Sequence, residues 1–232
     1  MGENGCDYLG KYKAILFDLD DTLLDRDQAV ENLFFVILET CYGDVKDSVK
    51  NIMLEKFKEY DKGNYGDGNK VKVIEPFFDE FPPKHRIPSS DIQTFWNHHF
   101  PDCFSVNQNI INILNTIKKQ VKVAIITNGS TERQKAKIVN TNLDNLFEVI
   151  IISEEVGLSK PDKRIYELAL KRLNVQPESA LFVGDNLELD IIGGPQNVNI
   201  RGIWFNPQEA VNNTEIKPFA EIISFDELLS FV

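Results

Sequence analysis

Cysteine is scarce in this sequence, and its pattern excludes two common uses of the residue. The 232 residues include three cysteines, Cys6, Cys41 and Cys103. Their odd number argues against a disulfide framework, and their spacing is not that of a metal site. We therefore expect free thiols in a reducing compartment.

Histidine is equally scarce, and its placement excludes a familiar kind of catalysis. The three histidines, His85, His98 and His99, all fall in one stretch of the chain, away from the ends of the predicted strands. No Ser-His-Asp arrangement is therefore expected. His98 and His99 are adjacent, so in a helix they face different sides and do not predict a metal site.

Long apolar runs are missing, and basic residues are outnumbered by acidic ones. No segment reaches the length of a membrane-spanning helix, and the first residues contain no apolar signal stretch. With 25 basic and 36 acidic residues the net charge is −11, which argues against nucleic acid or an anionic membrane as a partner. We expect a cytoplasmic protein, either a monomer or a homodimer.

An apolar strand that ends in carboxylates is the most informative segment that is present. Ala14–Phe17 has no polar residue, as expected of a buried parallel strand, and Asp18, Asp20 and Asp21 follow at once. In an extended segment Asp18 and Asp20 lie on one side, with about 6–7 Å between their Cα atoms. Such a pair can hold a divalent cation and flank a reacting group. A turn or a helix cap is the alternative.

A second predicted strand ends in small hydrogen-bonding residues. Thr127 offers a hydroxyl, and Gly129, after Asn128, lets backbone N–H groups approach a ligand closely. Ser130 or Thr131 could cap the helix that follows, whose N-terminus favours an anion. An ordinary junction between a strand and a helix is the alternative.

Two further segments carry charged residues at similar positions. Lys160 precedes Pro161, which suits the first turn of a helix, so we expect Lys160 in a loop, either solvated or directed at a phosphate. Asp185 follows the apolar strand 180–184, and Asp190 falls in the first turns of the next predicted helix. Asp190 can turn back toward the strand end or serve as a helix-capping acid.

The order of these elements predicts an α/β fold with a doubly wound, Rossmann-like parallel sheet. The predicted strands are 13–18, 121–126, 148–152, 180–184, 200–204 and 220–223. The predicted helices are 106–119, 130–140, 162–173, 187–197 and 225–231.

An insertion separates the first two strands, because residues 19–120 are far more than one crossover helix requires. Apolar residues recur in it at helical spacing. We therefore predict a core of residues 1–24 and 105–232 and a helical cap of residues 25–104.

Taken together, the motifs resemble those of the haloacid dehalogenase superfamily of hydrolases. The resemblance runs from about Lys13 to the C-terminus and rests on four motifs in order: Phe17–Leu23, Ile126–Gly129, Lys160–Pro161, and Gly184–Asp185 with Asp190. Residues 184–206 look like the branch of pyrimidine-type nucleotidases and N-acylneuraminate-9-phosphatases. The chain departs from the family at Gly193-Gly194-Pro195, which should shorten or kink the helix, and at Asn186, where many members have Ser or Thr.

The resemblance implies an Mg²⁺-dependent phosphatase acting on a small phosphorylated metabolite, of the nucleotide or sugar phosphate class. Asp18 would be the nucleophile that forms an aspartyl-phosphate, and Asp20 the general acid and base. The family binds its metal through the Asp18 carboxylate, the Asp20 backbone carbonyl and the Asp185 carboxylate. Asp190 would orient this site.

By the same resemblance, Thr127, Asn128 and Gly129 would bind the phosphoryl oxygens, and Lys160 would neutralise the phosphate and Asp18. The alternatives are a phosphomutase, a haloacid dehalogenase or a non-catalytic binding protein with the same fold. Asp20 argues against a dehalogenase, because expelling a halide needs no acid. The intact motif set argues against a protein without catalysis.

Overall fold

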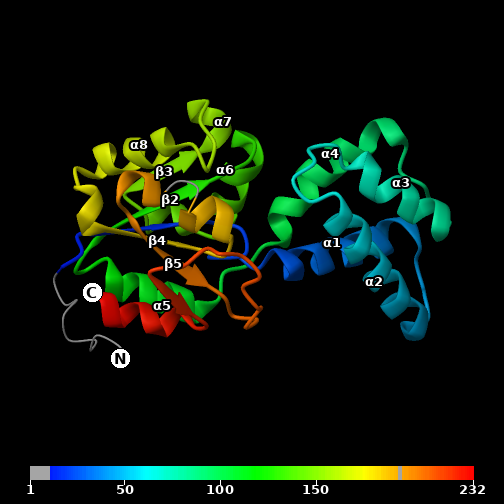
Figure 1. Ribbon diagram of the computed structural model, residues 1–232. Coiled ribbons are helices and arrows are strands. Elements are labelled where there is room, and N and C mark those ends of the chain that lie inside the picture. Colours follow the sequence, from blue (N-terminus) through cyan, green and yellow to red (C-terminus); the bar gives the residue numbers. More distant parts are fainter. Residues whose placement is uncertain (1–10, 193–194) are drawn as a thin grey trace. The chain divides into compact units, whose positions relative to one another are not determined.

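The structure is a computed structural model that describes residues 11–192 and 195–232. Backbone contacts divide this part of the chain into two compact units. The first combines the described residues up to Leu24 with Val106–Val232, and the second is Asp25–Ser105 (Figure 1).

The first unit is built on a parallel sheet of six strands in the order β3-β2-β1-β4-β5-β6. The strands are β1 (Ala14–Phe17), β2 (Lys122–Thr127), β3 (Val149–Ile152), β4 (Ala180–Gly184), β5 (Arg201–Phe205) and β6 (Ala220–Ile222). From β1 the chain builds outward through β2 and β3 and then returns to build in the other direction from β4. The predicted class, a doubly wound parallel α/β sheet, is confirmed, with its switch point between β1 and β4.

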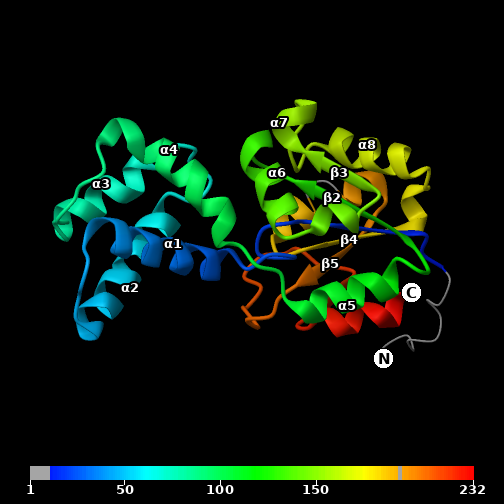
Figure 2. The ribbon, with the colours of Figure 1, turned by 180° about the vertical axis from the view of Figure 1, so that it is seen from behind.

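Helices connect these strands and cover both faces of the sheet (Figures 1 and 2). The α-helices of this unit are α5 (Gln108–Ile117), α6 (Thr131–Asn140), α7 (Ser153–Val156) and α8 (Lys163–Leu173). The 3-10 helices are Leu143–Asn145, Pro177–Ser179, Gln196–Val198 and Phe225–Phe231, and Leu187–Ile192 is a π-helix.

Apolar packing fixes the sheet on each side. On one face, Leu16 and Phe182 join a buried cluster with Tyr166 of α8, whose ring meets Phe182 edge-on at 5.3 Å between centroids. On the other face, the Phe17 ring stacks on Phe225 at 6.1 Å between centroids. Alternate residues of β1 thus serve opposite layers, as the pleat requires, so both faces hold the central strand rigidly.

The register of β1 determines where the polar residues meet. Phe17 pairs with Ile125 of β2 and with Val183 of β4. Because all three strands are parallel and in step, the residues that follow them emerge at the same edge of the sheet.

The second unit is helical. Its helices are α1 (Arg26–Cys41), α2 (Asp47–Gly63), α3 (Val71–Glu80), α4 (Ser89–His99) and the 3-10 helix Phe100–Cys103. Aromatic rings from different helices form its core, with Phe57 at 5.2 Å from Phe77 and 6.3 Å from Trp96 between centroids. A buried ion pair between Arg26 and Asp61, 2.6 Å long, joins α1 to α2.

The helices after the third and fourth motifs differ from the prediction. The predicted helix 187–197 is a π-helix followed by a 3-10 turn, and Gly193 and Gly194 lie outside the described residues. The C-terminal helix is 3-10 rather than α. Helix α8 begins at Lys163 and is capped by the Asp162 side chain, so Pro161 precedes the helix and does not form its first turn.

Cys41 and Cys103 are buried free thiols, as predicted, whereas Cys6 lies outside the described residues. Burial raises the pKa of both thiols to about 11, so they stay protonated at neutral pH. Among the described helices, none combines the length and the apolar character needed to cross a membrane.

Candidate functional site

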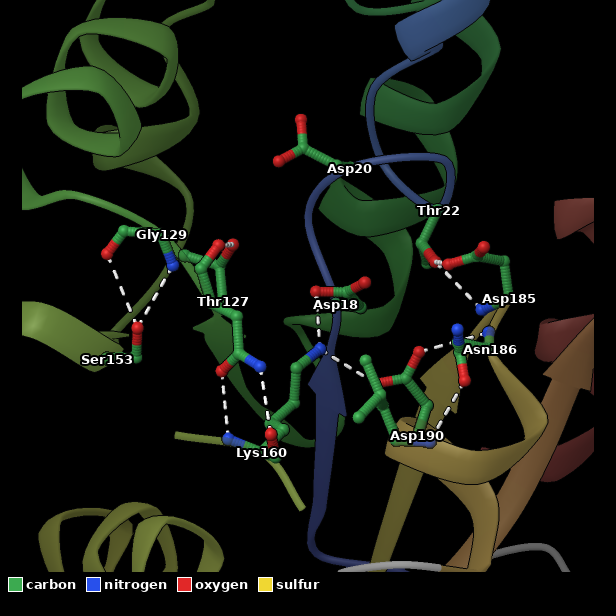
Figure 3. Close-up of polar contacts among 12 residues, drawn as sticks. Asp18, Asp20, Thr22, Thr127, Gly129, Ser153, Lys160, Asp185, Asn186 and Asp190 are labelled. Atoms are coloured by element: carbon green, nitrogen blue, oxygen red, sulfur yellow. Dashed lines mark hydrogen bonds and ion pairs between the residues drawn. The ribbon is translucent and has the colours of Figure 1, made fainter. Parts of the chain in front are cut away.

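The candidate site lies at the switch point of the sheet, where three neighbouring strands end. Asp18 follows β1, Thr127 is the last residue of β2, and Asp185 follows β4. Figure 3 shows Asp18 beside the Lys160 ammonium, with Thr127 to one side and Asp185 to the other. The structure thus brings together residues that lie far apart in the sequence.

Lys160 links two of the predicted carboxylates. Its Nζ lies 2.6 Å from Asp18 Oδ1 and 2.7 Å from Asp190 Oδ1. The exposed fractions of these side chains are 2% for Lys160, 13% for Asp18 and 0% for Asp190. Lys160 is therefore not a solvated surface lysine. Asn128 fixes its backbone, because the Lys160 N–H donates to Asn128 Oδ1 at 2.8 Å and Asn128 Nδ2 donates to the Lys160 carbonyl at 2.9 Å.

Negative charge exceeds positive charge around this lysine. Carboxylate oxygens of Asp18, Asp185 and Asp190 lie within 4.8 Å of one another. Burial raises the pKa of Asp18 well above its usual value; Lys160 opposes the rise and Asp190 adds to it. Burial, followed by the Asp190 and Asp21 charges, raises the pKa of Asp185 to about 7. With all three carboxylates ionised, one ammonium would leave two net negative charges, so a divalent cation would favour the ionised form of the cluster.

Asp190 lies in the π-helix that follows β4, and its side chain reaches back to the end of that strand. Its Oδ2 accepts from the Asn186 N–H at 3.1 Å, while its Oδ1 faces Lys160. A Cβ on Gly184 would come within 2.4 Å of Asp190 Cγ. Gly184 therefore provides the space into which the Asp190 carboxylate folds, and of the two readings of Asp190 the structure selects the return to the strand end.

Thr22 and Trp204 hold Asp185, and sequence reasoning did not single out either one. The Asp185 N–H donates to Thr22 Oγ1 at 3.1 Å, and that hydroxyl lies 3.3 Å from Asp185 Oδ1. Trp204 Nε1 donates to the Asp185 carbonyl at 2.8 Å. For Thr22, the available signal in the sequence was that it lies within the motif at residues 17–23.

A family model, described as haloacid dehalogenase-like hydrolase, matches residues 12–196, which is more than half of the chain. The chain belongs to the haloacid dehalogenase-like hydrolases. A glyceraldehyde 3-phosphate phosphatase of Pyrococcus furiosus is 32% identical over 222 residues, covering 92% of this chain and 89% of the relative. The pyrimidine 5'-nucleotidase YjjG of Escherichia coli is 27% identical over 94% of this chain and 96% of its own.

A solved structure of the HAD-hydrolase YfnB of Bacillus subtilis, bound to magnesium, has a similar fold. Its TM-score is 0.72 at 22% identity, over 94% of this chain and 96% of that one. The predicted family and the predicted enzyme class, a phosphoric monoester hydrolase, are therefore confirmed.

The Asp20 carboxylate of this hydrolase points away from Asp18 (Figure 3). Two side chains of α6 bind it instead. Lys137 Nζ lies 2.7 Å from Asp20 Oδ1 and 2.9 Å from Oδ2, and Gln134 Nε2 donates to Oδ2 at 3.0 Å. Sequence reasoning did not identify Gln134 and Lys137. Their spacing of three on a predicted helix directly after Gly129 was the only signal.

Gly129 has a hydrogen-bond partner that the sequence did not indicate. Its N–H donates to the Ser153 hydroxyl at 3.0 Å (Figure 3), so binding a phosphoryl oxygen would require this N–H to exchange partners. Ser130 occupies the N-cap position of α6, but its side chain makes no capping bond, and its hydroxyl accepts from Arg133 Nε at 2.9 Å.

Proposed function

We propose that this hydrolase is an Mg²⁺-dependent phosphatase that acts on a small phosphorylated metabolite through an aspartyl-phosphate on Asp18. The observation that carries the proposal is the buried arrangement of Lys160 between Asp18 and Asp190, beside Asp185. It combines a nucleophilic carboxylate, a fixed cation and an excess of negative charge that suits a divalent metal.

The donor set fits Mg²⁺, because it consists of oxygens from carboxylates and a backbone carbonyl. Asp18 and Asp185, with the backbone carbonyl of Asp20, would hold the ion. Both oxygens of Asp190 already accept from Lys160 or Asn186, which supports an orienting role rather than direct coordination. When bound, Mg²⁺ would neutralise the carboxylates and the phosphate so that they can approach one another.

The remaining chemistry belongs to the side chains of the chain itself. An oxygen of Asp18 would attack phosphorus in line with the leaving oxygen, which departs as the new bond forms. Lys160 would stabilise the charge that collects on the phosphoryl oxygens. Thr127 and the Asn128 backbone would bind those oxygens. Asp20 would protonate the leaving alkoxide and then take a proton from the water that hydrolyses the aspartyl-phosphate.

The substrate class that we propose is a nucleotide or sugar phosphate. Its support is the pair of relatives, one named a glyceraldehyde 3-phosphate phosphatase and the other a pyrimidine 5'-nucleotidase. The helical unit Asp25–Ser105 would serve as the cap that selects the leaving group.

A panel of phosphorylated metabolites and p-nitrophenyl phosphate, assayed with and without Mg²⁺, tests this function. We expect hydrolysis that stops on exhaustive chelation and returns when Mg²⁺ is added, with the highest kcat/KM for a nucleotide or sugar phosphate. Phosphatase activity that survives chelation, or release of chloride from 2-chloropropionate without any phosphatase activity, would contradict the proposal.

A further inference from the structure

The side chains that hold Asp20 form a buried polar cluster on one face of α6. Lys137 and Gln134 are three residues apart, so they lie on the same side of the helix. Their exposed fractions are 5% and 3%. Lys137 contacts both carboxylate oxygens of Asp20, and Gln134 contacts one of them. The Asp20 carboxylate is thus fixed by three hydrogen bonds from a single rigid element.

Gln134 also connects Asp20 to the end of β2. Besides its bond to Asp20, Gln134 Nε2 donates to Thr127 Oγ1 at 2.6 Å. An amide nitrogen carries two hydrogens, one for each of these acceptors. Because the Thr127 oxygen accepts here, its own hydrogen has to go elsewhere. The Asn128 carbonyl, at 3.5 Å, is a weak acceptor at that distance, so a phosphoryl oxygen can receive this hydrogen.

The neighbouring loop is shaped around Gln134. A Cβ on Gly129 would lie 3.0 Å from Gln134 Cγ and 3.1 Å from Cδ, and the φ of Gly129 is +146°. Burying an amide and an ammonium costs free energy that apolar side chains on the same helix face would avoid. The buried positions of Gln134 and Lys137, and the loop at Gly129 that makes room for Gln134, therefore indicate that the two polar groups have a use beyond packing.

We propose that Gln134 and Lys137 are positioning residues for the reaction: together they orient the Asp20 carboxylate, and Gln134 also directs the Thr127 hydroxyl toward the phosphoryl group. This inference rests on the proposed phosphatase function. Its physical basis is preorganisation, because a general acid works only from within hydrogen-bond reach of the leaving oxygen. Without Lys137, the Asp20 side chain would spread over several rotamers and spend less time in the productive one.

The test compares Lys137→Met and Gln134→Met with a matched control, Lys135→Met. Lys135 lies on the exposed side of α6 and forms an ion pair with Glu155. Each variant is assayed with p-nitrophenyl phosphate, whose leaving group needs no proton, and with an alkyl phosphate, whose leaving group does. The rate compared is that of alcohol release in the first turnover, because the later hydrolysis of the aspartyl-phosphate also uses Asp20 and is common to both esters. We expect Lys137→Met to lose roughly 10–100-fold in this rate for the alkyl ester, part of the range typical of general acid catalysis. Its loss in the same step for the nitrophenyl ester should stay within about threefold.

Three comparisons separate positioning from packing. In a variant that already carries Asp20→Asn, adding Lys137→Met should lower the alkyl phosphatase activity little further, because both changes act through the same carboxylate. Lys137→Arg should restore part of the alkyl phosphatase activity. Gln134→Met should in addition weaken inhibition by inorganic phosphate, which Lys137→Met should leave unchanged. Lys135→Met should behave as the wild type throughout. If Lys137→Met does not fold, Lys137→Gln takes its place.

Equal losses for both esters in Lys137→Met, or losses additive with Asp20→Asn, would overturn the inference and leave Lys137 a packing residue. A crystal structure of Lys137→Met gives an independent answer, because the Asp20 carboxylate should then leave its position beside α6. An Asp20 carboxylate that stays in place would overturn the inference about Lys137, whether or not the wild type is active. The proposed phosphatase function is contradicted by a different result, namely that the wild type hydrolyses neither ester.

Discussion

Replacing Lys160 with Met removes the ammonium at the centre of the site while keeping a side chain of similar length. Lys160 Nζ lies within 2.7 Å of both Asp18 and Asp190, and its side chain is almost wholly buried. Without it, these two carboxylates and Asp185 remain together, with no cation between Asp18 and Asp190. The variant therefore tests whether the charge balance of the cluster stabilises the fold.

The expected cost is large for a single substitution. Removing one partner of a buried ion pair costs about 3–5 kcal/mol, compared with about 5–15 kcal/mol for the whole stability of a typical domain. The cost should depend on pH. Burial already raises the pKa of Asp18, and the loss of Lys160 would raise it further. A carboxyl group whose pKa is raised in the folded state stabilises the fold when protonated, so the deficit should shrink as the pH falls.

Urea unfolding at pH 5 and pH 7.5 measures this effect. We expect Lys160→Met to be less stable than the wild type by about 3–5 kcal/mol at pH 7.5 and by clearly less at pH 5, with partial recovery in Mg²⁺. Lys135→Met, which removes an exposed ion pair with Glu155, should stay within about 1 kcal/mol of the wild type at both pH values. A deficit below about 1 kcal/mol for Lys160→Met, or one that does not change with pH, would refute the reasoning.

Two further predictions follow from the turn after β4. Gly184→Ala should displace Asp190, because the new Cβ would lie 2.4 Å from its Cγ; we expect a loss of about 1–3 kcal/mol by urea unfolding and a fall in kcat. Gly63→Ala, with no atom within 4 Å of the added Cβ, should be neutral or slightly stabilising, and equal effects of the two changes would contradict the argument. Because the pKa of Asp185 is about 7, protons should compete with Mg²⁺ below that pH and weaken its binding by about tenfold per pH unit. Calorimetric titration at pH 5, 6 and 7 measures this, and an affinity that is constant over the range would exclude Asp185 as a ligand.

The sequence was sufficient to predict which strand ends would meet. Asp18, Thr127 and Asp185 each stand directly after or at the end of an apolar strand, and parallel pairing brings such positions to one edge of the sheet. Local patterning and one topological rule are enough for this result. They do not determine side-chain partners, which depend on how the helices dock.

Gln134 and Lys137 illustrate that limit. Their spacing of three places them on one side of the helix, but it does not distinguish them from solvated residues, because their burial follows only from the docking of α6 beside Asp20. Gly129 was expected to direct its N–H to a phosphate, but Ser153, which follows β3, accepts it. That contact joins residues from two different strand ends, and no local pattern indicates it.

The π-helix after β4 could not be read from apolar spacing for a similar reason. The segment 187–197 has the apolar pattern of an ordinary helix, yet Asp190 must turn back to Lys160 and to the Asn186 N–H. Gly184 permits that close return. A wider helical turn at a functional position is a known device, and the tertiary contacts of Asp190 select it here.

Nucleophilic attack by Asp18 is the central step of the proposed mechanism, and trapping the phosphoenzyme tests it. The protein is quenched in acid during turnover of p-nitrophenyl phosphate with Mg²⁺, digested and analysed by mass spectrometry. We predict a phosphoryl group on the peptide that contains Asp18, none in Asp18→Asn, and a kcat for that variant below about a thousandth of the wild-type value, or about 4 kcal/mol in the barrier. A phosphoryl group on another residue, or an Asp18→Asn variant that retains more activity than this, would contradict the account.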